Sequence, residues 1–149
     1  MFMDRSMEKL AGELSKRGIR PSYQRVKVLE YLLTRRCHPT VDQIYSDLHQ
    51  EIPSISKSTI YNTLNALLKA NLTRAISIED NEIRYDFNVH NHGHFKCETC
   101  GAIFDFTANI DNLVADELKE FKIREKNMYF KGTCPECLKV NPAVRQIGP

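Results

Sequence analysis

Apolar residues in the first half of the chain recur with the period of an α-helix and predict four helices. Ser22 is the expected N-cap of the second helix, and Thr40 with Gln43 has the spacing of a capping box at the start of the third. Gly18 is the expected left-handed cap of the first helix, and Asn71 is the expected end of the fourth. The positions expected to face the core, helix by helix, are Met7, Leu10, Ala11 and Leu14; Val26, Leu29, Leu32 and Leu33; Val41, Ile44, Tyr45 and Leu48; and Ile60, Leu64, Leu67 and Leu68.

The period then changes from helical to alternating. Ile76 and Ile78 alternate with polar residues, and Ile83, Tyr85 and Phe87 alternate again after the turn sequence EDN. This pattern predicts a β-hairpin. Helices followed by a hairpin, within about ninety residues, predict a winged helix-turn-helix.

A second, smaller unit is expected after the hairpin. The sequence AIFDF at 102–106 predicts a strand, residues 110–121 have apolar side chains at helical spacing, and FKIREKNMYF at 121–130 alternates like a strand. A unit of this size needs a metal, a partner or both, because its apolar core is small. The expected fold class is α+β: a winged-helix unit and then a small α/β unit. The expected division is 1–88 for the first unit, 89–92 for a hinge and 93–149 for the second unit.

Composition and charge indicate the cellular location of the protein and the kinds of partner that it can bind. None of the 149 residues lies in an apolar run of the ~20 residues that span a bilayer, and the N-terminus has no signal-peptide core. A cytoplasmic protein without a membrane partner is therefore expected. The net charge is only +2, but seven basic residues against Glu30 alone lie between Lys16 and Arg36. Such a window suits DNA, with a solvated helix face as the alternative.

Four of the five cysteines form two C-x-x-C pairs, Cys97 with Cys100 and Cys134 with Cys137, separated by 33 residues. Two such turns can direct four thiolates to one point, and structural zinc takes this tetrahedral set. Disulfides are disfavoured in the cytoplasm, and free thiols are the other alternative. Cys37 is left out of the site, because a lone thiol is more often packed or idle than functional.

Three histidines precede the first cysteine pair at every second position, at residues 90, 92 and 94. In an extended chain these side chains share one face and Cys97 lies on the other, so two separate metal sites are expected. Imidazole and carboxylate ligands suit iron(II), manganese or zinc. Asp86, Asp105 and His38 are the candidates for further ligands, although each alone could be a surface acid or a helix cap.

At this point the sequence resembles a known family over nearly its whole length. The motifs are YQR at 23–25, HPT at 38–40, STIYNTL at 58–64, RYDF at 84–87, HGHFKCETCG at 92–101 and CPEC at 134–137. In this order and spacing they resemble the ferric-uptake-regulator (Fur) superfamily of repressors, and most closely its peroxide-responsive (PerR) branch.

The resemblance implies two metal ions in each chain. The four paired cysteines would hold a structural zinc ion, and a second set of residues would hold a regulatory Fe²⁺ or Mn²⁺ ion. This second set is His38, Asp86, His92, His94 and Asp105. An ion that binds residues from both units would shift the population toward a closed arrangement. In a homodimer, closure would set two recognition helices at the spacing of two half-sites in palindromic double-stranded DNA.

The fourth helix is the expected recognition helix. A tyrosine such as Tyr61 can pack on a thymine methyl, and an asparagine such as Asn62 can pair with adenine. Lys16 resembles the minor-groove lysine of the family. The expected DNA contacts are Lys16, Arg25, Ser58, Thr59, Tyr61 and Asn62.

Asp105 directs the resemblance toward peroxide sensing, because iron sensors of the family usually have glutamate there. The implied chemistry is oxidation of His38 or His92 by iron(II) and peroxide, followed by release of metal and DNA. The alternative within the family is an iron- or manganese-sensing repressor. The sequence NHGH at 91–94, where many iron sensors have HHDH, and Asn127 argue against an additional metal site. Tyr23 replaces the proline of the usual TPQR, which bears on the start of the helix more than on function.

Two other classes of protein are disfavoured. A zinc deaminase needs His-x-Glu and then Pro-Cys-x-x-Cys, whereas here the order is His-x-His and Pro135 lies inside its motif. The sequence also has no HExxH, so we expect no enzyme. A zinc-ribbon adaptor that binds only protein would have no use for the basic window or for a polar recognition helix.

Overall fold

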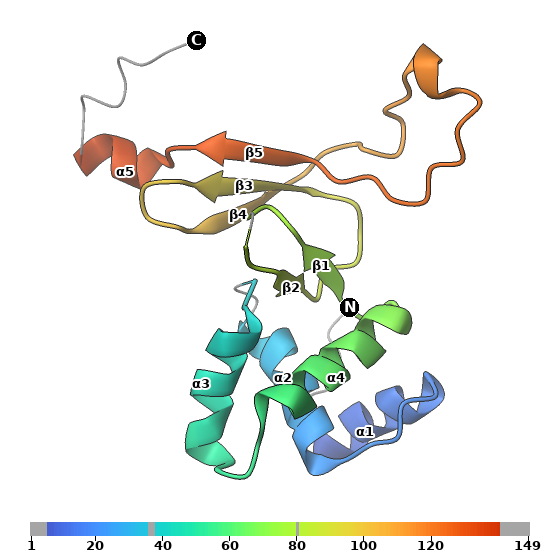
Figure 1. Ribbon diagram of the computed structural model, residues 1–149, viewed down its shortest axis with the longest axis vertical. Coiled ribbons are helices and arrows are strands. Elements are labelled where there is room, and N and C mark those ends of the chain that lie inside the picture. Colours follow the sequence, from blue (N-terminus) through green and yellow to red (C-terminus); the bar gives the residue numbers. More distant parts are fainter. Residues whose placement is uncertain (1–5, 36–37, 80, 141–149) are drawn as a thin grey trace. The chain divides into compact units, whose positions relative to one another are not determined.

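The computed structural model describes residues 6–35, 38–79 and 81–140 (Figure 1). These residues divide into two compact units, with the boundary between Val89 and His90. The first unit contains four helices and a two-stranded hairpin. The helices are α1 (Met7–Lys16), α2 (Tyr23–Arg35), α3 (Val41–Glu51) and α4 (Lys57–Lys69). Among the described residues, no helix is long and apolar enough to cross a membrane.

The four predicted helices are confirmed, and so are the signals at their ends. Thr40 and Gln43 form both hydrogen bonds of a capping box at the start of α3. Gly18 and Asn71 have φ angles of 73° and 54°, and each follows a helix that ends two residues earlier. The helices pack their apolar faces into one core, in which Leu10, Leu14, Leu29, Ile44, Ile60, Leu64 and Leu67 are fully buried.

The predicted hairpin is β1 (Arg74–Ile76) paired antiparallel with β2 (Arg84–Asp86). A third segment joins it: Thr40 forms an isolated bridge with Arg84, and the Tyr85 N–H donates to the Pro39 carbonyl at 3.0 Å. These contacts tie the wing to the loop that leads into α3. The first unit is thus a winged helix-turn-helix. Asp80, in the predicted turn, lies outside the described residues.

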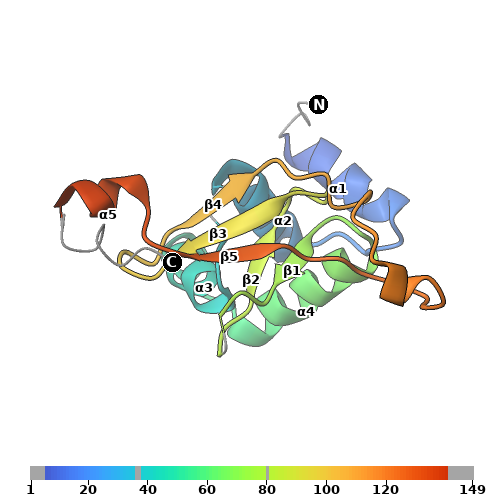
Figure 2. The same cartoon turned by 90° about the horizontal axis from the view of Figure 1, so that it is seen from above.

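The second unit is built on a three-stranded sheet in the order β4-β3-β5, with β3 (Gly93–Cys97) between β4 (Ile103–Phe106) and β5 (Tyr129–Gly132) (Figure 2). β3 is antiparallel to β4 and parallel to β5. A short helix, α5 (Pro135–Val140), follows β5 directly. The parallel pairing brings the C-terminal ends of β3 and β5 to the same end of the sheet.

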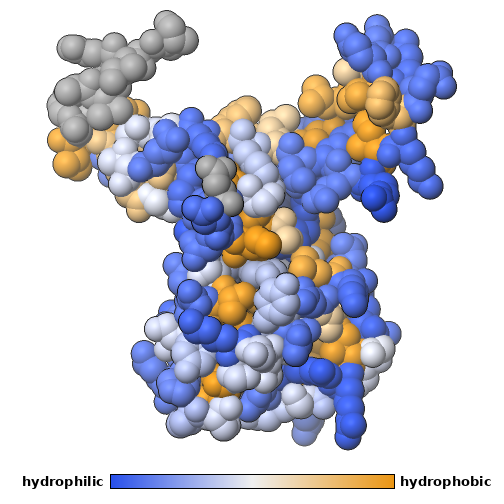
Figure 3. All heavy atoms as spheres, viewed as in Figure 1, coloured by the Kyte–Doolittle hydropathy of each residue, from blue (hydrophilic) through white to orange (hydrophobic). Residues whose placement is uncertain are grey.

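The predicted helix at 110–121 is wrong. The structure has only a single 3₁₀ turn there, Asp116–Leu118, and the apolar side chains after Ile110 are exposed, with Val114 at 72% and Phe121 at 66%. Hydrophobic side chains lie at the surface of this segment, at the upper right of Figure 3. Within the described part of the chain nothing covers this face, and an isolated helix of about twelve residues is marginal in water. Likewise, the strand predicted at 121–130 begins only at Tyr129.

Candidate metal centres

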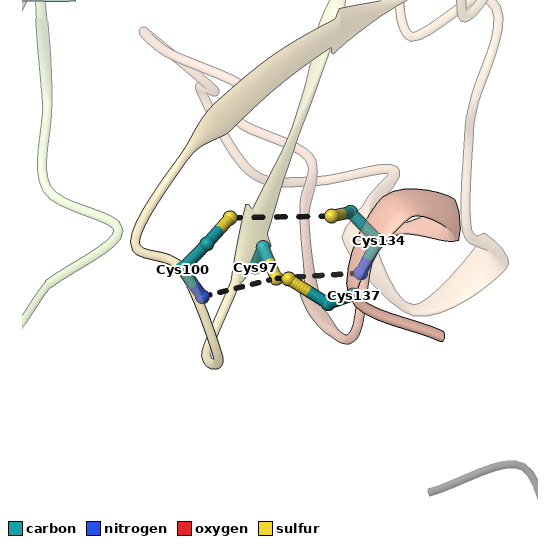
Figure 4. Close-up of side chains that lie close together, drawn as sticks. All are labelled: Cys97, Cys100, Cys134 and Cys137. Atoms are coloured by element: carbon teal, nitrogen blue, oxygen red, sulfur yellow. Dashed lines mark hydrogen bonds between the residues drawn. The ribbon is translucent and has the colours of Figure 1, made fainter. Parts of the chain in front are cut away.

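The sheet brings the two C-x-x-C pairs together. Cys97 is the last residue of β3, its parallel register partner is Gly132 at the end of β5, and Cys134 follows two residues later. Gly101 closes the first turn with a φ of +79°, a conformation that favours glycine, and its N–H donates to the Cys97 carbonyl. Both pairs therefore lie at one edge of the sheet, with the four sulfurs facing one another (Figure 4).

The spacing of the sulfurs fits a tetrahedral ion. The Sγ atoms of Cys97 and Cys137, and those of Cys100 and Cys134, are each 3.9 Å apart, and all four lie within 4.8 Å of one another. Zn–S bonds of about 2.3 Å in a regular tetrahedron require S···S distances of about 3.8 Å. A disulfide needs about 2.05 Å, and all four cysteines are free thiols.

The electrostatics of the cluster also suit a dication. The backbone N–H groups of Cys100 and Cys134 lie 3.5 and 3.3 Å from the Cys97 sulfur, and they lower the pKa of that thiol to about 6. The neighbouring sulfur groups, Cys134 foremost, raise the pKa of Cys137 to about 12. One thiolate is thus stabilised by the backbone, while four negative charges this close together require a cation among them. The donor set fits zinc.

A second cluster is formed in the same unit by His92, His94 and Asp105. Asp105 is the direct register partner of His94 across the β3–β4 ladder. Its Oδ1 lies 3.4 Å from the His94 Nε2 and 3.5 Å from the His92 Nε2. Both imidazoles are buried, at 7% and 3% exposure, whereas the Asp105 side chain is 43% exposed. Two nitrogens and one oxygen therefore converge on one point, which is a set that suits iron(II), manganese or zinc.

Backbone contacts fix how this cluster presents its atoms. The His92 Nδ1 lies 2.6 Å from the His90 carbonyl, which can only accept, so Nδ1 carries the proton and Nε2 is left to bind a metal. Gly93 separates the two imidazoles and faces Phe106, since a Cβ there would lie 2.1 Å from the ring. That close approach gives a packing reason for glycine in the sequence NHGH.

The remaining two predicted ligands lie in the first unit. The His38 Nε2 is 3.8 Å from the Asp86 Oδ2, and both residues are buried, at 6% and 7% exposure. The other Asp86 oxygen accepts from the Asn88 N–H at 2.8 Å, which orients the carboxylate. Sequence reasoning missed Asn88, and it also missed Arg84, whose guanidinium donates to the His38 carbonyl at 3.2 Å. A bond to a backbone carbonyl has no sequence signature.

The residues predicted to contact DNA lie on three helices of the first unit. Ser58, Tyr61 and Asn62 are exposed in the first two turns of α4, with Tyr61 at 52%. Thr59 is half-buried, and its hydroxyl lies 2.9 Å from that of Ser56, the N-cap of α4, so it helps to start the helix. The other two are Lys16, an exposed residue at the end of α1, and Arg25, a half-buried residue on α2.

A winged helix-turn-helix followed by a sheet unit with a four-thiol cluster and an imidazole–carboxylate cluster defines a metal-binding transcription regulator. Known proteins agree with this class. Residues 16–131 match the ferric uptake regulator family, and the chain belongs to that family. Members of this family are dimeric, DNA-binding transcription regulators.

Individual relatives share nearly the whole length of the chain. The peroxide-responsive repressor PerR of Staphylococcus epidermidis is 36% identical over 138 residues, which cover 91% of this chain and 92% of that protein. The ferric uptake regulator Fur of Helicobacter pylori, whose structure has three functional metal binding sites, superposes with a TM-score of 0.71 at 26% identity, covering 92% of this chain and 97% of that one. The Campylobacter jejuni peroxide stress regulator superposes with a TM-score of 0.64 at 27% identity, covering 88% of this chain and 98% of that one.

Proposed function

We propose that this protein is a cytoplasmic, metal-dependent repressor that releases DNA when hydrogen peroxide oxidises one of its metal-ligating histidines. The observation that carries the proposal is that each unit holds part of the predicted ligand set. His38 and Asp86 belong to the first unit, whereas His92, His94 and Asp105 belong to the second. The 36% sequence identity to peroxide-responsive repressors supports hydrogen peroxide as the signal.

The switch rests on one regulatory ion that binds all five of these residues. Each part alone offers fewer ligand atoms than the whole set, because the first unit supplies two and the second unit three. An ion that binds both parts favours the arrangement in which the units are held together. The size of this preference equals the difference between the ion's binding free energies for that arrangement and for the open one. Loss of one ligand weakens this preference and so weakens DNA binding.

The chemistry of the signal follows from the ligands. Bound iron(II) would activate hydrogen peroxide for cleavage of its O–O bond. The imidazoles of His38 and His92 are the proposed targets: one peroxide oxygen would be added to a ring carbon, which is oxidised by two electrons, and the other would leave as water. An oxidised imidazole is a poorer ligand, so the set is broken and the DNA is released. Manganese(II) at the same ligands holds the DNA-binding arrangement without this oxidation.

DNA is read by the winged helix of the first unit. Tyr61 and Asn62 on α4 would contact base edges, while Ser58 and Arg25 would contact phosphates. Thr59 is also a proposed contact, through its partly exposed face, and Lys16 would enter the minor groove. A homodimer places two such helices on a palindromic operator.

The second unit would provide both the dimer interface and the structural zinc site. Several apolar side chains of this unit are exposed in the single chain and are available to a second copy: Leu113, Val114, Leu118 and Phe121. Zinc bound by the four cysteines would keep the unit folded, because metal binding and folding are coupled when the ligands come from distant segments.

The test is operator binding by zinc-loaded protein titrated with iron(II) or manganese(II), before and after peroxide. Both metals should restore DNA binding, and peroxide should abolish it only in the iron form, with one oxygen atom added to a peptide containing His38 or His92. If the iron form releases DNA without an added oxygen atom, or if both metal forms still bind DNA after peroxide, the iron- or manganese-sensing alternative is supported instead. Asp105→Glu is the matched variant: it keeps a carboxylate but adopts the residue usual in iron sensors, and it should retain metal-dependent binding with a slower peroxide response.

A further inference from the structure

The backbone of His38 has a conformation that needs support. Its φ is +48°, in the left-handed region that non-glycine residues seldom occupy. The following residue, Pro39, further restricts the conformations open to the residue before it. Such a conformation persists only when surrounding contacts determine it. The contacts that do so are therefore part of whatever His38 does.

Arg84 provides the most specific of these contacts. Its Nη1 donates to the His38 carbonyl at 3.2 Å, and its Nε donates to the Glu79 Oε1 at 2.8 Å. Both side chains are largely buried, at 14% and 21% exposure, so solvent screens the pair only in part. The guanidinium thus joins the loop of His38 to the far end of the wing.

The strand places this arginine beside a ligand. Arg84 and Asp86 are two residues apart on β2, and side chains at that spacing point to the same face of a strand. Asp86 faces the His38 imidazole at 3.8 Å, while Arg84 holds the His38 carbonyl. One face of β2 therefore supplies both Asp86, a proposed ligand, and Arg84, which holds the backbone of the second proposed ligand, His38.

We infer that Arg84, held in place by Glu79, is a positioning residue for the regulatory metal: it fixes the His38 backbone so that the imidazole meets the Asp86 carboxylate, and it couples the metal ligands to the wing. This inference rests on the proposed function and adds to it a route by which metal binding orders the wing. Lysine cannot replace arginine fully, because the planar fork directs two N–H groups to two acceptors at once.

Electrostatic repulsion and positioning predict opposite effects on metal affinity when the charge of Arg84 is removed. Arg84 is a cation near a site for a cation, so replacing it with glutamine should tighten metal binding if charge alone acted. If Arg84 acts by positioning, the same substitution should weaken metal binding, although a repulsive charge has been removed. Loss of a partner that orients a ligand typically lowers metal affinity about 10- to 100-fold.

The experiment measures Mn²⁺ affinity of the zinc-loaded, full-length protein from the electron paramagnetic resonance signal of free Mn²⁺. R84Q should bind Mn²⁺ roughly 10-fold more weakly than the unaltered protein, with unchanged zinc content. E79Q should weaken binding in the same direction, and the R84Q/E79Q double variant should be no weaker than R84Q, because the two residues act as one unit. R20Q and E82Q, which remove the same charges from exposed residues of the same unit, should bind as the unaltered protein does.

Mn²⁺ affinity of R84Q equal to or tighter than that of the unaltered protein overturns the inference. If R84Q does not fold, R84K and E79Q carry the test: both should fold and bind more weakly, and unaltered affinity in both overturns the inference equally. H38A separates this from the proposed function. If H38A leaves Mn²⁺ binding intact, the regulatory site itself is wrong, whatever R84Q does.

Discussion

Removal of zinc should unfold the second unit and leave the first unit folded. Among the described residues, the buried apolar side chains of the second unit are Cys97, Ile110 and Cys134, and two of these belong to the thiol cluster. Burial of Ile110 contributes only about 3 kcal/mol. Structural zinc contributes roughly 10–16 kcal/mol in small domains, which is as much as the entire stability of many proteins. The first unit, in contrast, has a continuous core formed by four helices.

The assay is hydrogen–deuterium exchange of the protein before and after chelation, with zinc loss confirmed by elemental analysis. Peptides from 93–106 and 128–140 should lose their protection, while peptides from α2 and α4 should keep theirs. C134S should reproduce the effect without a chelator, and C37S, which removes a thiol outside both C-x-x-C pairs, should not. Protection of the β3–β4 ladder in fully zinc-free protein would refute the reasoning, because the sheet would then be stable without the ion.

Three further changes test other parts of the structure. Gly93→Ala should lower the free energy of unfolding by about 1–3 kcal/mol, since its Cβ would lie 2.1 Å from the Phe106 ring; Gly12→Ala, with nothing within 4 Å, is the control and should be neutral or stabilising in thermal melts. Tyr61→Ala should weaken binding to the operator by about 1–3 kcal/mol in a fluorescence titration and leave Mn²⁺ affinity unchanged. Leu113→Glu, at a position 64% exposed in the single chain, should shift the dimer toward monomer in sedimentation velocity; an unchanged dimer would place the interface elsewhere.

The sequence predicts local structure well where local signals decide it. The helix boundaries at Gly18, Thr40 and Asn71 follow from backbone conformations and caps that a few neighbouring residues determine. The predicted helix at 110–121 failed for the opposite reason. Its apolar period was real, but a helix of that length depends on a surface to pack against, and no described part of the single chain provides one.

In the candidate metal centres, too, the sequence predicts the local features and not the long-range ones. Ligand types and C-x-x-C spacing predict which residues can bind a metal, because that chemistry belongs to the side chains. The parallel pairing of β3 with β5 and the register of Asp105 opposite His94 are long-range features that no local pattern encodes. Arg84 was missed because its partner is a backbone carbonyl.

The central claim is that one regulatory ion takes ligands from both units. Anomalous diffraction from crystals of the zinc- and manganese-loaded protein measures this directly. We predict a single manganese peak in each subunit, coordinated by His38 and Asp86 together with His92, His94 and Asp105. A manganese peak bound by the three residues of the second unit, with the His38 imidazole directed elsewhere, would contradict it.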